Sequence, residues 1–178
     1  MSAAVPERSG PAWTTNQDLD PAGLREAFGV FPSGVVAVAA QVDGRPVGLA
    51  ASSFTSVSLE PALVSISVAN TSRTWPELRR AEQLGVTVLA DHHDRLCRQL
   101  AGPVATRFDD VALEVSPEGA LTVVDGLAGF VTTVHREVEA GDHTIVLLAL
   151  HTVLAATGRN GSGPLVFHRS GFRSLAQA

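Results

Sequence analysis

Short apolar runs with a period of two, separated by turn residues, recur along most of this chain and constrain its fold more than any other feature. Residues 35–42 (VVAVAAQV) and 45–50 (RPVGLA) flank Asp43-Gly44, a pair that tolerates the positive φ of a tight hairpin turn. Alternating side chains let such a run bury one face and expose the other. The other segments that we predict as strands are 53–57, 62–68, 84–89, 112–115, 120–123, 128–139, 143–157, 165–168 and 171–175.

Helix signals are few and scattered among these runs. Asp20-Pro21 supplies an N-cap carboxylate followed by proline at the first helical position. Thr74 and Glu77 have capping-box spacing and predict a helix to about residue 82, and Asp91 predicts the start of a short third helix. Since strands and helices do not alternate regularly, we expect a mainly β fold with a few helices, an antiparallel barrel or sandwich rather than a doubly wound parallel sheet.

The length of 178 residues corresponds to one domain, which we expect to span residues 20–178 after a flexible N-terminal tail at residues 1–19. With 45% hydrophobic residues, the chain can build a sizeable core. The longest apolar run, 144–156, is shorter than the roughly 20 residues that span a bilayer, and residues 1–15 lack a secretory signal, so no membrane partner is expected. Cys97 is the only cysteine and excludes an internal disulfide, which is typical of a cytoplasmic protein.

The charged residues exclude several functions. The 13 basic residues against 18 acidic ones give a net charge of −5, so a nucleic-acid partner is not expected. All of the basic residues are arginine, which rules out a Schiff-base lysine and the lysine of a P-loop. The six histidines show no metal-ligand spacing, so no metal site is predicted. The glycine fingerprint of a Rossmann unit is also missing.

Hydroxyl side chains are unusually dense in residues 51–58 (ASSFTSVS) and continue through residues 65–74. Small hydroxyls and free backbone N–H groups at strand ends can surround a phosphate or the polar edge of a heterocycle. Arg73 and Arg107 could hold phosphate oxygens, because guanidinium groups bind two oxygens at once. The same hydroxyls are also common on ordinary half-exposed strands, so this pattern alone leaves both interpretations open.

A set of motifs in fixed order resembles the flavin reductase family, and in particular the small reductase component of two-component flavin-dependent monooxygenases. The resemblance covers roughly residues 24–175. It rests on FGVFPSGVVAVAA (28–40), GLAASSFTSVSLEPALVSISV (48–68), TSRTW (71–75), LGVTVLA (84–90), RF (107–108), GDHTIVLL (141–148) and PLVFHRSGF (164–172).

The resemblance implies an FMN-binding split β-barrel that forms a homodimer. In that family NADH or NADPH reduces FMN or, alternatively, FAD, and the reduced flavin passes to a separate oxygenase. Hydride transfer needs the two rings stacked with their reacting atoms about 3–3.5 Å apart, so the protein acts mainly by positioning them. This would explain a catalyst without an obvious acid–base constellation.

The resemblance also implies site residues. His143 in the Gly-Asp-His turn is the side chain with a candidate catalytic role, either as a hydrogen-bond donor to the nicotinamide amide or in the proton route, and a packing role is the alternative. Phe172 stands where many relatives have tyrosine, so a hydroxyl contact is not expected there. The flavin-side residues are Pro32, Ser33, Gly34, Val35, Ala51, Ser52, Ser53, Phe54 and Ser56; the phosphate-side residues are Ser67, Asn70, Ser72, Thr74 and Arg107; the nicotinamide-side residues are His168 and Phe172, together with His143.

Three other functions are compatible with these residues. The chain could be a flavin-binding module without turnover, an FMN-tight oxidoreductase that acts directly on an organic substrate, or a purely structural dimer. The sequence leaves open NADH against NADPH, FMN against FAD, flavin as prosthetic group or substrate, and the identity of the oxygenase.

Overall fold

The computed structural model describes residues 19–154 and 161–175. The predicted tail therefore lies outside the described residues apart from Leu19, as do residues 155–157 of the strand predicted at 143–157. The helices are α1 (Pro21–Gly29), α2 (Trp75–Leu78) and α3 (Asp94–Leu100), with single 3-10 turns η1 (Asp91–His93) and η2 (Val104–Thr106). The strands are β1 (Ser33–Gly34), β2 (Val36–Val42), β3 (Arg45–Ala51), β4 (Thr55–Leu59), β5 (Ala62–Ala69), β6 (Leu84–Val88), β7 (Leu113–Val115), β8 (Ala120–Val123), β9 (Ala128–Ala140), β10 (His143–Leu154), β11 (Val166–His168) and β12 (Gly171–Arg173).

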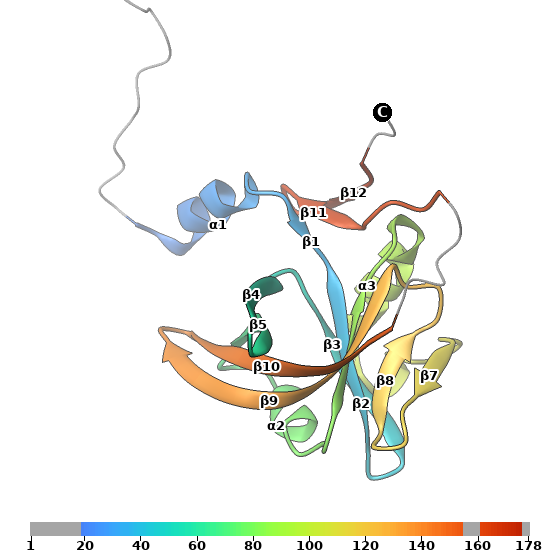
Figure 1. Ribbon diagram of the computed structural model, residues 1–178. Coiled ribbons are helices and arrows are strands. Elements are labelled where there is room, and N and C mark those ends of the chain that lie inside the picture. The colour runs from blue at the N-terminus through green and yellow to red at the C-terminus, as the bar shows by residue number, and fades with distance from the viewer. Residues whose placement is uncertain (1–18, 155–160, 176–178) are drawn as a thin grey trace, which may run out of the picture.

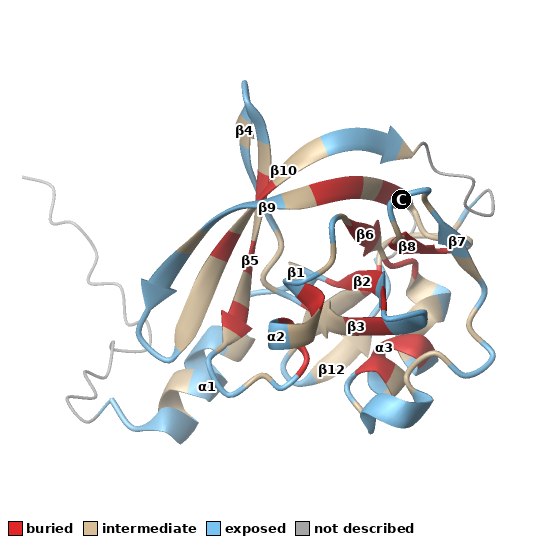
Figure 2. Cartoon of the chain, turned by 90° about the horizontal axis from the view of Figure 1, so that it is seen from below, coloured by how far each residue is buried: buried red, intermediate tan, exposed pale blue. Residues whose placement is uncertain are grey.

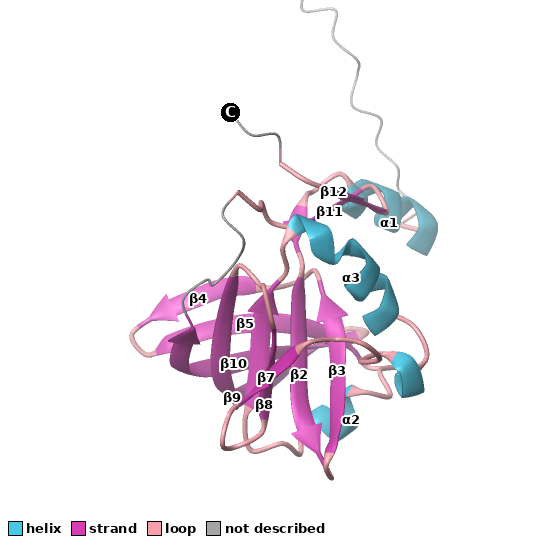
Figure 3. Ribbon diagram, turned by 90° about the vertical axis from the view of Figure 1, so that its right-hand side faces the viewer, coloured by secondary structure: helices cyan, strands magenta, loops and turns pink. Residues whose placement is uncertain are grey.

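Two antiparallel sheets make up the described part of the molecule (Figure 1). The larger has the order β4-β5-β10-β9-β6-β2-β8-β7, with β3 also paired to β2. The smaller has the order β1-β11-β12 and lies at one end of the larger sheet, close to α1 (Figures 1 and 3). The prediction of a mainly β, antiparallel fold with a few helices is confirmed.

Both sheets are open: within the described residues they do not close into a barrel. Within the described residues, β4 and β7 end the path of the large sheet and do not pair with each other. The long strands β9 and β10 run together from His143–Ala140 to Leu154–Gly129, with register shifts at Leu147/Leu148 and Leu150/Thr152. Such bulges bend strands and increase their twist, so the sheet curls without closing.

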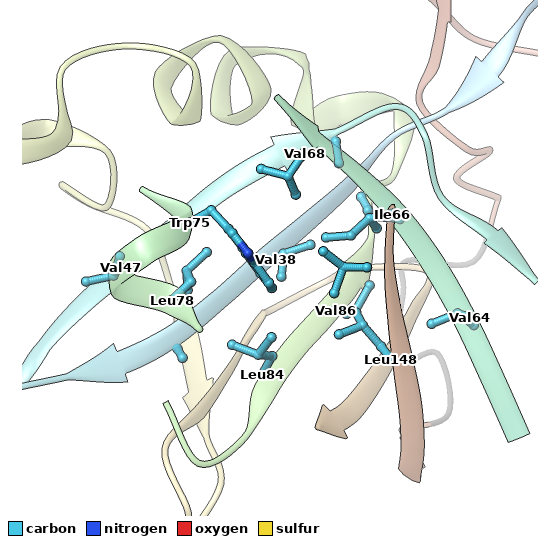
Figure 4. Close-up of a cluster of buried hydrophobic side chains, with 14 of the residues drawn as sticks. Val38, Val47, Val64, Ile66, Val68, Trp75, Leu78, Leu84, Val86 and Leu148 are labelled. Carbon is cyan, nitrogen blue, oxygen red and sulfur yellow. The ribbon is translucent and has the colours of Figure 1, made fainter. Parts of the chain in front are cut away.

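The main core lies inside this curl (Figure 4). Val38, Ile66, Val86 and Leu148 are fully buried, each from a different strand, and Leu78 of α2 joins them. Figure 2 shows the buried residues concentrated along β2, β6 and β8. A second cluster forms between α3 and the small sheet, and it contains Val35, Ala37, Leu89, Leu96, Cys97, Leu100, Val123 and Leu165.

Two local predictions from turn and cap residues are confirmed. Asp43 and Gly44 both have positive φ, 51° and 78°, and join β2 to β3 as the hairpin signal required. Asp20 accepts hydrogen bonds from the backbone N–H groups of Ala22 and Gly23, each at 2.9 Å, and Pro21 opens the helix. These bonds hold the pKa of the Asp20 carboxyl below its usual value.

The predicted capping box at Thr74 and Glu77 is wrong. Thr74 has helical φ and ψ and its side chain makes no capping bond, and α2 ends at Leu78 instead of near residue 82. The hydroxyl of Ser72 instead accepts the hydrogen bond from the Trp75 N–H. Thr74 Oγ1 accepts from Arg107, 33 residues away, so a tertiary contact replaces the local one.

Several predicted strand limits move by a residue or two, as expected where pairing decides the ends. The strand predicted at 53–57 lies at Thr55–Leu59. None of the helices among residues 19–154 and 161–175 is long and apolar enough to cross a bilayer.

Candidate functional site

Two adjoining clefts contain most of the predicted site residues. The first, which we call the aromatic cleft, has a volume of about 900 Å³ between α1, the loop before β1 and the β3–β4 connection. The second, which we call the arginine cleft, has a volume of about 560 Å³ between β3, the end of β5 and the segment before α2. Ser52 and Ser53 line both clefts, so the two lie side by side along this segment.

The predicted residues divide between these clefts. Those that line the aromatic cleft are Pro32, Ser33, Gly34, Ser52, Ser53, Phe54 and Ser56. Those that line the arginine cleft are Ala51, Ser52, Ser53, Ser67, Ser72, Thr74, Arg107 and His143, joined by Arg73.

Ser53 holds the shared wall in place. Its hydroxyl accepts from the Ser67 N–H at 2.8 Å and donates to the Ser67 carbonyl oxygen at 3.1 Å. The β3–β4 connection is thereby fastened to β5 by a side chain rather than by strand pairing. Ser53 thus fixes the position of its neighbours, while its own hydroxyl already has two backbone partners.

Arg107 is the most firmly held side chain of the arginine cleft. Its Nη1 donates to Thr74 Oγ1 at 2.7 Å and to the Gly48 carbonyl oxygen at 2.9 Å, and its Nε donates to the Gly102 carbonyl oxygen at 3.0 Å. These partners come from three separate segments, and Thr74 is itself buried. The guanidinium group is therefore oriented before any ligand binds, and among the described residues its Nη2 has no hydrogen-bond partner.

His143 lies at the far side of the same cleft. It begins β10 directly after the turn at Gly141, whose φ is 65°. Its Nδ1 is 2.8 Å from Asp142 Oδ1, and the hydrogen bond from His143 keeps the pKa of the exposed Asp142 carboxyl below its usual value. The His143 side chain is 44% exposed, so a ligand in the cleft can reach its ring.

Four predicted residues lie outside both clefts. Val35 is buried in the second core cluster. The side chain of Asn70 accepts from Thr144 Oγ1 and donates to the Gly141 carbonyl oxygen, so it ties β5 to the β9–β10 turn. His168 ends β11 without lining a described cleft, and Phe172 lines a separate hollow beside Arg173.

The sequence reasoning missed the apolar wall of the aromatic cleft. Arg25, Phe28 and Phe31 contribute to it from α1 and the following turn, and Phe167 from β11. Phe28 and Phe31 are 69% and 78% exposed. The pair of aromatic residues three positions apart at the end of this segment was the signal that the sequence offered.

Other reactive side chains give no competing site within the described residues. No cluster of histidine, cysteine or acidic side chains there could hold a metal ion. Burial raises the pKa of the Cys97 thiol to about 11, so it is a poor nucleophile near neutral pH. His93 accepts from the Ala90 N–H, and burial lowers its pKa, so it acts as a neutral structural side chain.

The joined clefts suit a flat ring system that carries an anionic chain. The aromatic cleft offers apolar side chains and serine hydroxyls over a volume large enough for a tricyclic ring. The arginine cleft offers two guanidinium groups and several hydroxyls, which bind phosphate. A flavin mononucleotide has both parts, so the residues present fit this cofactor.

Comparisons with known proteins agree with this geometry. A family profile described as "Flavin reductase like domain" matches residues 28–176, and the chain therefore belongs to that family. The chain is 37% identical over 146 residues to the stachydrine N-demethylase reductase subunit Stc3 of Rhizobium meliloti (strain 1021), covering 82% of this chain and 63% of that protein. It is 32% identical over 160 residues to a flavin reductase of Pseudomonas putida, covering 89% and 92%.

Comparison with solved structures also indicates the flavin reductase family. The Streptomyces globisporus NADH:FAD oxidoreductase SgcE6 superposes with a TM-score of 0.82 at 32% identity, covering 94% of this chain and all of that one. The first two curated relatives are longer proteins, of which this chain spans 63% and 48%. The predicted resemblance to the flavin reductase family is confirmed.

Proposed function

We propose that this chain is an NAD(P)H-dependent flavin reductase that reduces FMN or FAD and releases the reduced flavin. The observation that carries the proposal is that the aromatic and arginine clefts meet at Ser52 and Ser53, because a ring and its phosphate chain need two such unlike surfaces next to each other. Relatives named "NADH:FMN oxidoreductase" and "FMN reductase (NADH) SmoA", at 34% and 35% identity, support the reaction.

In the proposed site, each region of the chain has a distinct task. Arg107 binds the flavin phosphate with the free edge of its guanidinium group, helped by Arg73 and by the hydroxyl of Ser72. The segment Ser52–Phe54 borders the ring, and Phe54 is braced from behind by Phe130, with ring centroids 6.1 Å apart. A braced aromatic wall keeps water from the apolar side of the ring.

The flavin, when bound, supplies the redox chemistry by accepting a hydride from the nicotinamide, so the protein needs no acid–base pair of its own. Backbone N–H groups along the Ser52–Phe54 segment donate hydrogen bonds to the ring and favour its reduced, anionic form. Asp142 accepts from the Nδ1–H of His143 and so orients the ring, which leaves Nε2 of the neutral imidazole to accept a hydrogen bond from the nicotinamide amide N–H at the edge of the arginine cleft.

A homodimer is part of the proposal. The inner side of β10 is fully buried at Val146 and Leu148, whereas Ile145 and Leu147 on its other side remain partly exposed in the single chain. Phe28 and Phe31 likewise have no covering surface in this chain. We place a second copy against this sheet face and α1, with the curled sheet serving as the split barrel, so that a neighbouring copy would complete the aromatic cleft.

The acceptor of the reduced flavin in this proposal is a separate oxygenase, in the cytoplasm. Relatives named as reductase components of monooxygenases support this, among them the trigonelline monooxygenase reductase component of Acinetobacter baylyi, at 33% identity. The buried, unpaired thiol of Cys97 suits a reducing compartment.

The test is an aerobic assay of NADH and NADPH oxidation with FMN, FAD and riboflavin in turn. Steady turnover with excess free flavin is expected. A flavin-binding module would oxidise at most one equivalent of NADH per bound flavin. An oxidoreductase specific for an organic substrate would keep a yellow cofactor through dialysis and ignore added flavin. Sedimentation velocity checks the dimer, and a monomer at micromolar concentration would contradict it.

A further inference from the structure

The segment of residues 72–74, which lines part of the arginine cleft, is not held by strand pairing. It lies between the end of β5 and the start of α2. Thr74 Oγ1 accepts from Arg107 Nη1 at 2.7 Å, and the Ser72 hydroxyl accepts from the Trp75 N–H at 3.2 Å. The position of this segment therefore depends on the residue that follows it, Trp75.

Trp75 is anchored by a carboxylate from a distant strand. Its side chain is only 6% exposed and lies among the residues of the main core (Figure 4). The indole Nε1–H donates to Glu137 Oε1 at 2.7 Å. Glu137 is on β9, directly opposite the buried Val146 of β10, so its side chain is on the core side of the sheet. A buried indole N–H needs a partner, and a charged acceptor makes a stronger bond than a neutral one.

The second oxygen of the same carboxylate holds the other end of α2. Arg79 comes directly after this helix, and its Nη2 is 2.8 Å from Glu137 Oε2. Two further ion pairs join this region to the β2–β3 hairpin at 3.3 and 3.4 Å, but their four side chains are 37–65% exposed. Exposed ion pairs contribute little, and a helix of four residues has little stability of its own. Among the described residues, Glu137 is therefore the main polar anchor of α2.

A displacement of Trp75 reaches the phosphate end of the site through one peptide bond. Thr74 precedes Trp75 in the chain, and its hydroxyl is one of three acceptors that orient the guanidinium group of Arg107. Hydrogen bonds weaken steeply when their distance and angle depart from the optimum. The orientation of Arg107 thus depends on how firmly the indole is held.

We infer that Glu137 is a positioning residue for the phosphate end of the flavin site. Through Trp75 it fixes residues 72–74, and through Thr74 it orients Arg107. The inference rests on the proposed function and deepens it, because it assigns part of the affinity for the flavin phosphate to a carboxylate that lines neither cleft.

The sign of the expected effect is informative. Considered as a charge alone, a carboxylate repels a phosphate, so its removal would strengthen the binding of FMN. The positioning role predicts the opposite, because Arg107 loses part of its orientation when Glu137 is removed.

The test removes either end of the bond between Trp75 and Glu137 and compares FMN with riboflavin, which has no phosphate. Glu137→Ala and Trp75→Phe should each raise the Kd for FMN by about three- to tenfold and change the Kd for riboflavin by less than about twofold. The double variant should lose no more affinity than either single one, because both substitutions remove the same bond. Flavin fluorescence titration measures these constants.

Three further variants separate the indole bond from the charge. Glu137→Gln keeps an amide oxygen that can accept from the indole, so it should restore the affinity for FMN to within about twofold of the wild type. Arg79→Ala removes only the ion pair and should have an equally small effect. Glu139→Ala is the matched control, because Glu139 is an exposed carboxylate two residues further along the same strand.

Two other measurements report on positioning directly. In Glu137→Ala the KM for FMN should rise while kcat at saturating FMN stays unchanged, because the reacting rings are not touched. Tryptophan emission reports the state of the indole, and a Trp13→Phe background leaves Trp75 as the only tryptophan of the chain. The emission should shift to longer wavelength in Glu137→Ala and keep its wild-type position in Glu137→Gln.

Several results would overturn the inference. It fails if Glu137→Ala weakens FMN and riboflavin equally, leaves both unchanged or strengthens the binding of FMN. It also fails if Glu137→Gln loses as much affinity as Glu137→Ala. If Glu137→Ala does not fold, Trp75→Phe decides, and equal losses for the two flavins in that variant contradict the inference. A wild-type protein that binds and reduces FMN, with variants that bind it equally well, would sink this inference alone, whereas a wild-type protein that binds no flavin would remove the proposed function as well.

Discussion

The arginine cleft and the aromatic cleft differ in how much of their structure one chain provides. Arg107 makes three hydrogen bonds to other segments, and Ser53 makes two to Ser67. The aromatic cleft depends on α1, which buries none of its residues and leaves Phe28 and Phe31 exposed. Folding of a single chain thus orients the first cleft but leaves one wall of the second without support.

This difference changes how much binding free energy is spent on ordering side chains in each cleft when a ligand binds. Ordering a side chain on binding costs about 0.5–1.5 kcal/mol, a cost that folding has already met for Arg107 but not for the side chains of α1. The phosphate end of the site should therefore be ready in a monomer. The ring end should depend on a second copy or on the ligand itself.

The largest effect is expected from Arg107→Ala. Loss of a charge-assisted contact should raise the Kd for FMN by roughly 10- to 100-fold. Riboflavin has no phosphate, so its binding should change little. Fluorescence titration with both compounds measures the difference, and Arg95→Ala, an exposed arginine of α3, is the control. If the affinities for FMN and riboflavin fell equally, Arg107 would act only as a structural brace.

Ser53→Trp examines the junction of the two clefts. The indole should occupy ring space and raise the Kd for FMN by about tenfold, while sedimentation still shows a dimer. Ser53→Ala removes the hydrogen bonds to Ser67 but keeps the space, so it separates steric blocking from loosening of the β3–β4 connection. If FMN affinity in the tryptophan variant matches the wild type, the ring does not lie here.

His143→Ala should alter the nicotinamide side of the site selectively. We expect the KM for NADH to rise by about three- to tenfold and the KM for FMN to stay nearly constant, because one hydrogen bond to the nicotinamide is lost. Steady-state kinetics with each substrate varied in turn measures both constants. Unchanged constants would leave His143 as a residue that only orders the β9–β10 turn.

The smallest change in stability is expected from the double substitution Phe28→Ser, Phe31→Ser. Because both rings are exposed, the free energy of unfolding of the single chain should change by less than about 0.5 kcal/mol. Urea unfolding at low protein concentration measures it, and sedimentation should show a weakened dimer. A loss of stability with the dimer intact would mean that α1 packs on its own chain.

Local signals in the sequence predicted much of the fold. The Asp43-Gly44 hairpin, the Asp20 cap and the alternating runs around Val38 and Ile66 all depend on neighbours in the chain, and all are confirmed. The Thr74 capping box was wrong because Arg107, distant in sequence, forms a charge-assisted bond with the same hydroxyl. Alternation shows that a strand has two faces but not whether the sheet meets itself, so the sequence pattern could not decide between a barrel and a sandwich.

The candidate site was predictable in part. The hydroxyl-rich segment at 51–58 and the motifs of the family resemblance indicated most residues that line the two clefts. The resemblance to the family placed Asn70 and Val35 in the site, yet Asn70 binds the β9–β10 turn and Val35 is buried in the core. A motif gives the order of residues along the chain, whereas the direction of each side chain depends on the strands around it.

The amino-acid sequence by itself determined the strands, the hairpins, the family and the chemistry available for a site. Only the tertiary structure decided that Arg107 meets Thr74 and Gly48, that Ser53 is bonded to Ser67, and that α1 lies uncovered. The reason is physical: turns and alternation arise from interactions between near neighbours, whereas a cleft is bounded by segments that become adjacent only when the sheet curls.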